Sequence, residues 1–158
     1  MASANQGLQA PFPGLWMNDE DWTLGTLLEI VRQTAQAQLA RGAELEPYGV
    51  KLLAEPARPV TFFPGQTLPG ADQETLLRAI LEELRAPSSD ALLGVALVLA
   101  LQTEAGQRLF TAQIESASYR VVALFRYWQG PDGAAIVAEP EIGGELMVRE
   151  GLDWPRRP

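Results

Sequence analysis

The sequence predicts an α+β fold: a two-layer domain with a mainly antiparallel sheet of five to six strands and two helices packed on one face. Three observations predict this class. Two segments repeat apolar residues at helical spacing, the second half of the chain shows the apolar runs and alternation of strands, and short turns join those strands. Strands that follow one another through short turns pair antiparallel. The predicted order is therefore α-β-β-α-β-β-β.

The chain of 158 residues has the length of one domain. Residues 1–17 lack a hydrophobic period and contain Pro11 and Pro13, so we expect an N-terminal arm there. Residues 18–150 are expected to form the domain, and residues 151–158 are expected to form a C-terminal tail.

Two helices are predicted from their start and stop signals. The first begins at Asn18, which together with Asp21 resembles a capping box, and it ends at Gly42. The second is capped by Asp72 and stops before Pro87. The apolar stripes are Leu24, Leu27, Leu28, Val31, Ala35 and Leu39 in the first helix, and Leu76, Leu77, Ile80, Leu81 and Leu84 in the second.

The strands are predicted from apolar runs between turn residues. Residues 44–55 and 58–63 form a hairpin whose prolines suit edges and strand ends. Residues 92–102 are almost continuously apolar, which favours a strand buried on both faces, with a third helix as the alternative. The remaining predicted strands are 108–117, 119–128 and 134–138, and residues 145–149 are either a further edge strand or part of the tail.

Composition excludes several kinds of chemistry. The chain has no cysteine and no histidine, so thiolate nucleophiles, Ser-His pairs and the commonest transition-metal ligands are missing. Lys51 is the single lysine beside eleven arginines. We therefore expect no cofactor, and the composition disfavours catalysis.

Charge and hydropathy limit the partners and the location. A net charge of −8 opposes binding to nucleic acid and to anionic membranes. Residues 1–14 lack the basic and apolar regions of a secretory signal, and the longest apolar run, 91–101, is too short to span a bilayer. We expect a cytoplasmic protein. The preference for Ala, Gly, Pro and Arg over Lys suits a bacterial source with GC-rich codons.

The stretch Glu44-Leu45-Glu46-Pro47-Tyr48-Gly49-Val50 follows the first helix. It resembles a Glu-x-x-Pro-aromatic-small segment found in a group of small bacterial α+β proteins without an established function. The resemblance covers about residues 24–128 and implies no activity, cofactor or catalytic residue. The element order is also similar to that of profilin-like and roadblock-type modules, which mostly bind other proteins.

The most informative segment for function is the strand predicted at 119–128. Strand alternation places Tyr119, Val121, Ala123, Phe125 and Tyr127 on one face, which is typical of a core, and Arg120, Val122, Leu124, Arg126 and Trp128 on the other. Arginine and tryptophan are enriched at protein interfaces. The alternative is an ordinary solvent face on which the arginine stems lie flat.

Two acidic groups are weaker candidates. Glu44 and Glu46 share one face of a predicted strand beside Tyr48 and could act as paired carboxylates, although two solvated glutamates on an edge strand are the favoured explanation. The run from Asp19 to Asp21 could hold a hard cation, but the electrostatics of a helix start already explain it. We expect no metal site.

These observations favour a non-catalytic protein-interaction module of the adaptor or immunity type. It would bind a protein partner, or a second copy as a homodimer, through an open sheet face carrying Arg120, Arg126 and Trp128. One alternative is a small-molecule-binding domain or carboxylate-based hydrolase that uses Glu44, Glu46 and Tyr48. A further alternative, nucleic-acid binding through the arginines, would show a steep dependence on salt.

Overall fold

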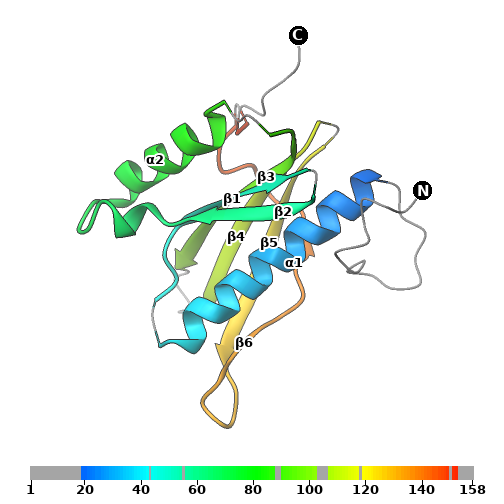
Figure 1. Cartoon of the computed structure of the whole chain (residues 1–158). Coiled ribbons are helices and arrows are strands. Elements are labelled where there is room, and N and C mark those ends of the chain that lie inside the picture. The colour runs from blue at the N-terminus through cyan, green and yellow to red at the C-terminus, as the bar shows by residue number, and fades with distance from the viewer. Residues whose placement is uncertain are drawn as a thin grey trace.

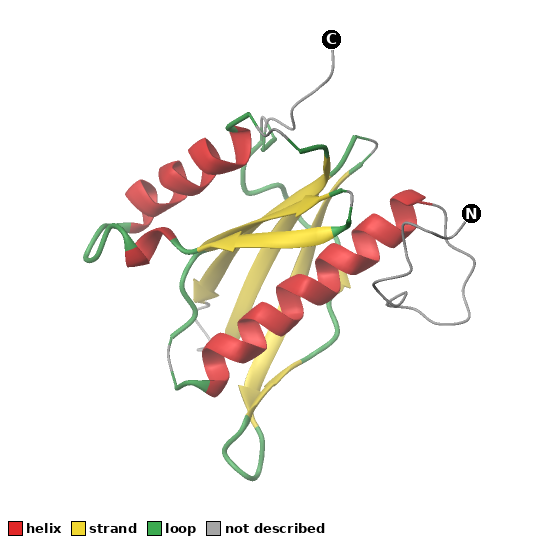
Figure 2. Ribbon diagram, viewed as in Figure 1, coloured by secondary structure: helices red, strands yellow, loops and turns green. Residues whose placement is uncertain are grey.

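The predicted fold class, element order and antiparallel sheet are confirmed by the computed structural model, which describes residues 19–42, 44–54, 56–87, 90–102, 107–117, 119–149 and 151–152 (Figures 1 and 2). In this part of the chain the elements are α1 (Asp19–Ala40), β1 (Tyr48–Leu53), β2 (Arg58–Phe62), the 3₁₀ turn η2 (Pro64–Gln66), α2 (Gln73–Arg85), β3 (Leu92–Gln102), β4 (Arg108–Glu115), β5 (Arg120–Gln129), β6 (Ala135–Val137) and β7 (Glu141–Ile142).

The strands form one curled sheet in the order β2-β1-β3-β4-β5-β6, and β7 also pairs with β5 (Figure 1). The predicted hairpin of the first two strands is present, but β1 begins at Tyr48 rather than at residue 44. Pro47 cannot donate to a ladder, and the Glu46 N–H donates instead to the Gln38 side chain of α1 at 2.9 Å. Glu44 and Glu46 therefore precede the strand.

Helix α1 covers one face of the sheet. Its side chains Leu27, Val31 and Ala35 are fully buried, and Gly42 ends the helical segment with a φ of 76°. The predicted cap at Asn18 lies outside the described residues. The core on this side joins α1 to residues of five strands, among them Tyr48, Val50, Leu52, Ala96, Val98, Phe110, Ala112, Ala123, Phe125 and Val137.

Helix α2 lies on the opposite face, so the prediction that both helices share one face is wrong. Asp72 caps α2 as predicted, accepting a hydrogen bond from the Thr75 N–H at 2.8 Å. Ile80 and Leu84 of α2 pack in a second core with residues of β3, namely Val95, Leu97 and Leu99. These three alternate with the β3 residues that face α1, so the strand is apolar on both sides. A sheet with two apolar faces needs a cover on each.

A short segment near the C-terminus completes the cover beside α2. We call residues 147–149 and 151–152 the C-terminal strap. Val148 and Leu152 of the strap are buried in the core of α2, although no ladder joins the strap to the sheet among the described residues. Residues 145–149 therefore form no edge strand, and Leu152, predicted to lie in a tail, belongs to the domain.

In the part of the chain that the structure describes, no helix is both long enough and apolar enough to cross a membrane.

Candidate functional site

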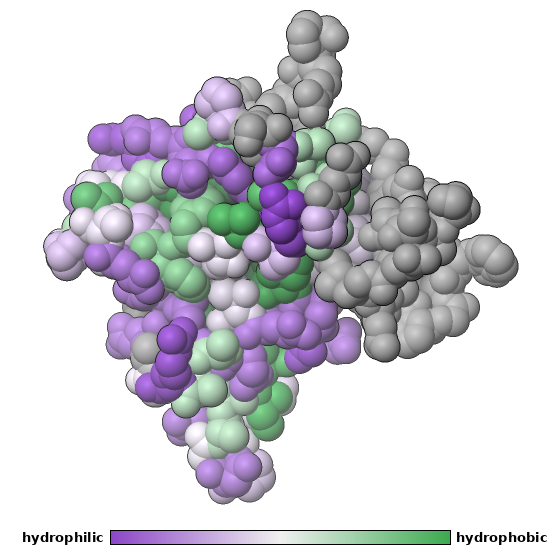
Figure 3. Space-filling model, in the orientation of Figure 1, coloured by the Kyte–Doolittle hydropathy of each residue, from purple (hydrophilic) through white to green (hydrophobic). Residues whose placement is uncertain are grey.

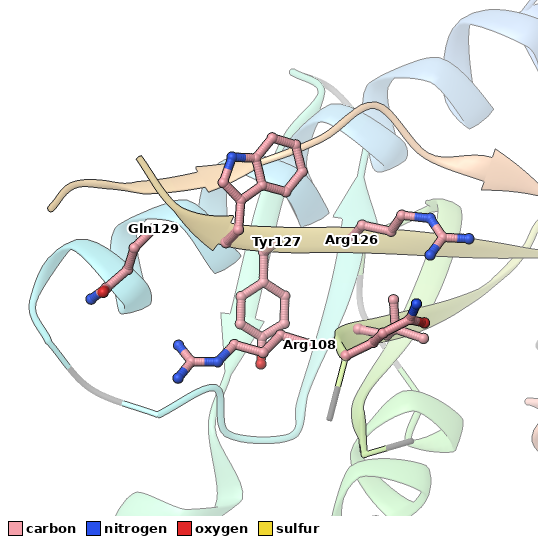
Figure 4. A pocket seen from close by; sticks show the side chains of 7 residues that line it. Arg108, Arg126, Tyr127 and Gln129 are labelled. Carbon is pink, nitrogen blue, oxygen red and sulfur yellow. The ribbon is translucent and has the colours of Figure 1, made fainter. Parts of the chain in front are cut away.

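A shallow groove of about 390 Å³ lies at the end of β5. Its walls come from the start of β4 and the end of β5: Gln107, Arg108, Leu109, Arg126, Tyr127, Trp128 and Gln129. Figure 4 shows Tyr127 and Arg108 on the same side of the β5 ribbon. The groove exists because the ladder between β4 and β5 ends at the pair Leu109 and Arg126, while β5 continues to Gln129 beside β6.

Helix α1 fixes the position of β6, the strand that pairs with the end of β5. Gln36 of α1 donates a hydrogen bond to the carbonyl oxygen of Ala135 and accepts one from the Val137 N–H at 3.2 Å. Both residues belong to β6, which pairs with the end of β5. The side-chain amide of Gln36 therefore fixes β6, and with it the position of Ile136 opposite Trp128.

Two large apolar side chains are exposed beside the groove. Trp128 is 48% exposed and its cross-strand partner Ile136 is 38% exposed. Apolar residues also reach the surface around the lower part of Figure 3, where Figure 1 places β6 and its turn. We call Trp128, Ile136 and Arg126, together with Arg108, which lines the same groove from the side of Tyr127 (Figure 4), the Trp128 surface.

The two arginines give this surface a local positive charge. Arg126 lies 3.6 Å from the Glu141 carboxylate, in an exposed pair of the kind that contributes little to stability. Arg108 is exposed and has no carboxylate partner among the described residues. The chain as a whole carries a net charge of −8, so two arginines at one groove are a local exception to its acidic composition.

Arg120 lies elsewhere, within a polar network under the strap. Its guanidinium pairs at 3.1 Å with Glu115, whose side chain is almost fully buried. The same Glu115 oxygen accepts the Leu152 N–H at 2.8 Å and the Gln113 side-chain amide at 2.9 Å. Among the described residues, the open sheet face predicted from the sequence is thus closed by the strap near Arg120 and is exposed near Arg126 and Trp128.

Tyr48, Glu44 and Glu46 do not form a site. Tyr48 is fully buried, and its hydroxyl donates a hydrogen bond to the Val31 carbonyl oxygen at 2.8 Å. Glu44 and Glu46 are exposed to solvent, and neither lines the groove. The hydroxyl of Tyr48 therefore lies in the core, whereas the two glutamates face solvent, and the three side chains are not brought together around one cavity in the part of the chain that the structure describes.

Replacement of Tyr48 by phenylalanine should test its structural role through pH. Burial raises the pKa of the Tyr48 hydroxyl, so the folded chain keeps the neutral phenol while the unfolded chain ionises above about pH 10. This contribution to stability is complete below about pH 10 and is lost as the pH rises further. We expect Tyr48→Phe to lower the free energy of unfolding by about 1 kcal/mol at neutral pH, through the lost hydrogen bond.

The difference should shrink by about 1.4 kcal/mol per pH unit above about pH 10, as measured by urea denaturation. A gap between wild type and Tyr48→Phe that stays constant from neutral pH to about pH 11 would show that the hydroxyl is not protected by the core.

The described residues contain no group of three or more carboxylates arranged to hold a metal ion. The side chains from Asp19 to Asp21, considered above for a cation, lie outside the described residues.

Sequence reasoning missed part of the Trp128 surface. The sequence predicts Ile136 within the strand 134–138 and Arg108 at the start of the strand 108–117, but it assigns neither residue to a binding surface. A signal was present, because a hairpin whose turn is centred on Asp132 brings Trp128 opposite Ile136. The uncovered end of β5 depends on where β4 begins, and no local pattern marks that point.

Comparison of the chain with protein-family models, with curated proteins and with solved structures finds no match. The resemblance suggested by residues 44–50, like the bacterial origin, stays a prediction.

Proposed function

We propose that this protein is a non-catalytic interaction module that binds a partner protein through the Trp128 surface. The observation that carries the proposal is the exposed pair of Trp128 and Ile136, flanked by Arg108 and Arg126. Exposed tryptophan and arginine side chains dominate the binding energy of many interfaces. The pair lies on a fixed sheet, so little conformational freedom is lost when it is covered.

Charge complementarity specifies the partner. A protein with net charge −8 repels most acidic surfaces at long range, but the Trp128 surface presents two guanidinium groups. A partner that offers carboxylates around an apolar contact would match it. The absence of histidine and cysteine from the sequence supports a role in binding rather than in catalysis.

A photo-crosslinking amino acid at position 136 tests this proposal in the cells that express the protein. We expect a discrete covalent adduct from position 136 that disappears when Trp128→Ala is added. The matched control is the same amino acid at position 60, because Val60 is similarly exposed but lies on β2. The partner recovered should then bind the purified wild type at least tenfold more tightly than Trp128→Ala in calorimetry.

Equal adducts from positions 60 and 136, or affinity unchanged by Trp128→Ala, would refute the proposal. Sedimentation equilibrium separates a further outcome. If the wild type forms a homodimer and Trp128→Ala dissociates it, the Trp128 surface binds a second copy of the chain. That result would overturn the proposal of an acidic partner protein.

A further inference from the structure

The C-terminal strap lies on the sheet face that α2 covers, and side chains of α2 and β4 hold it there. Figure 1 shows this part of the chain, coloured orange to red, close to the C-terminal end of α2. We call Arg85, Gln113 and Glu115, together with the apolar side chains of the core beneath α2, the strap seat. The strap seat holds the main chain of the strap as well as its side chains.

One residue of the strap is held through both of its main-chain groups. The side-chain oxygen of Gln113 accepts the Val148 N–H at 2.9 Å, and the Gln113 amide nitrogen donates to the Val148 carbonyl oxygen at 3.0 Å. In an antiparallel ladder, a residue exchanges the same two hydrogen bonds with the residue opposite it. The Gln113 side chain thus holds the strap as a neighbouring strand would.

One peptide group of the strap is held from two sides. Arg85 of α2 donates to the Gly151 carbonyl oxygen at 3.2 Å, and Glu115 of β4 accepts the Leu152 N–H at 2.8 Å. Both groups belong to the peptide bond between Gly151 and Leu152. Proteins hold bound extended peptides by hydrogen bonds to the main chain, with side-chain contacts for selectivity. The strap is therefore held in the way that a separate peptide would be.

Apolar contacts anchor the strap at two positions. Val148 and Leu152 are buried in one cluster with Leu84 of α2 and Leu97 of β3. Burial of these side chains is the main driving force that keeps the strap in place, and the hydrogen bonds add a smaller net contribution. A strap from a second copy carries the same residues and can make the same contacts.

The closed strap leaves two buried polar atoms of the strap seat without a hydrogen-bond partner in the described part of the chain. They are Oε1 of Glu115 and Nε of Arg85. An unpaired polar atom costs free energy while it is buried, and water can reach both atoms when the strap leaves. The strap therefore opens at a lower cost than the strands, whose main-chain groups are paired in ladders.

The connection between β7 and the strap can act as a hinge. Residues 143–145 are exposed, and Gly144 has a φ of 113°. Glycine adopts this conformation readily and can also adopt the extended conformations that a reaching chain needs. The Gly143 N–H donates to the Val122 carbonyl oxygen at 2.7 Å. The chain is thus anchored before Gly144, and β7 can stay in place when the strap leaves.

We propose that two copies of the chain exchange their straps, so that each strap occupies the strap seat of the other copy. The two seats are identical, so exchange keeps every contact of the strap and changes only the direction of the chain at the connection. Exchange of identical segments is a low-cost route to a dimer. Protein concentration and the conformation at Gly144 then set the balance between closed monomer and exchanged dimer.

Strap exchange is independent of the proposed function, because Trp128 makes no part of the strap seat. A dimer formed by exchange should persist in Trp128→Ala, whereas a dimer formed through the Trp128 surface should dissociate. The two proposals can therefore fail separately.

Paired single cysteines test the exchange directly, because the chain contains no cysteine of its own. The Thr111 hydroxyl of β4 contacts the Met147 sulfur of the strap at 2.7 Å. Thr111→Cys and Met147→Cys are made in separate chains of different mass, which are mixed at millimolar concentration and oxidised. The matched control mixes Val60→Cys with Met147→Cys, because Val60 is exposed on β2 and reports chance collision. We expect at least about fivefold more of the disulfide-linked pair from positions 111 and 147 than from the control, although the control thiol is the more accessible.

The double variant Thr111→Cys/Met147→Cys in one chain is the reference. We expect its disulfide to form within the closed monomer and between the copies of the exchanged dimer. A mixed-chain yield equal to that of the control, with a disulfide only within single chains of the double variant, would overturn the exchange. Absence of any disulfide between positions 111 and 147 would overturn the position of the strap on β4, and the proposal with it.

Gly144→Ala tests the hinge. Alanine at a φ of 113° strains the closed connection, whereas the exchanged connection is free to extend. The matched control is Gly70→Ala, because Gly70 also has a positive φ, 78°, and open space at its Cβ position, but lies before α2. In sedimentation equilibrium we expect the dimer fraction to rise about fivefold in Gly144→Ala and to stay unchanged in Gly70→Ala. Equal dimer fractions in the two variants would contradict exchange through this connection.

Discussion

Replacement of Phe110 by alanine is expected to lower the free energy of unfolding by about 3–5 kcal/mol. Phe110 is fully buried between α1 and the sheet, and its ring stacks on that of Phe125 with centroids 4.6 Å apart. Tyr127, which lines the groove, packs against the same ring at 6.0 Å. The substitution leaves a cavity and removes both aromatic contacts, a large part of the stability of a typical domain.

Urea denaturation followed by circular dichroism measures the effect. The control is Phe110→Leu, which keeps most of the volume and should cost only about 1–2 kcal/mol. A cost below about 1 kcal/mol for Phe110→Ala would contradict the packing of this core. The groove should also widen in Phe110→Ala, because Tyr127 loses its support.

Glu115→Ala should cost about 2–4 kcal/mol. One buried oxygen of Glu115 accepts hydrogen bonds from Leu152 and Gln113 and pairs with Arg120. Alanine leaves the Leu152 N–H without its acceptor, removes one of the two hydrogen bonds donated by the Gln113 amide, and leaves the Arg120 charge unpaired beside the strap. Because Arg120 is partly exposed, water can solvate it, which keeps the expected cost below that of a fully buried broken pair.

Two controls separate charge from shape. Glu115→Gln retains an acceptor for the Leu152 N–H and should cost less than alanine, whereas Glu141→Ala removes an exposed pair and should stay within about 0.5 kcal/mol of wild type. Hydrogen exchange at the Val148 and Leu152 amides should accelerate in Glu115→Ala before the rest of the domain is affected. Unchanged exchange at both amides would show that Glu115 does not hold the strap.

The fold was largely predictable because its signals are local. The helical repeats of α1 and α2 and the cap at Asp72 appear where the sequence places them. The side on which α2 packs was predicted wrongly, although the apolar run of residues 92–102 already indicated a strand buried on both faces. A strand buried on both faces needs a cover on each face. Helix α1 covers one face, and α2 with the strap covers the other.

The site was predictable only in part, for a related reason. Trp128 and Arg126 are exposed as the alternation of β5 indicates, but Arg120 on the same face is engaged by Glu115. Strand alternation identifies which residues share a face but not what covers that face. Tyr48 shows the converse: its aromatic ring suggested a site, but the start of β1 places it in the core.

The strap also affects the order in which the chain can finish folding. Synthesis proceeds from the N-terminus, so the strands emerge from the ribosome before Val148 and Leu152 emerge to complete the cover of Val95, Leu97 and Leu99. Until then the Glu115 carboxylate stays hydrated and this apolar surface stays open to chaperones. The nascent protein therefore gains the contribution of the strap to its stability only when residues 147–152 have emerged.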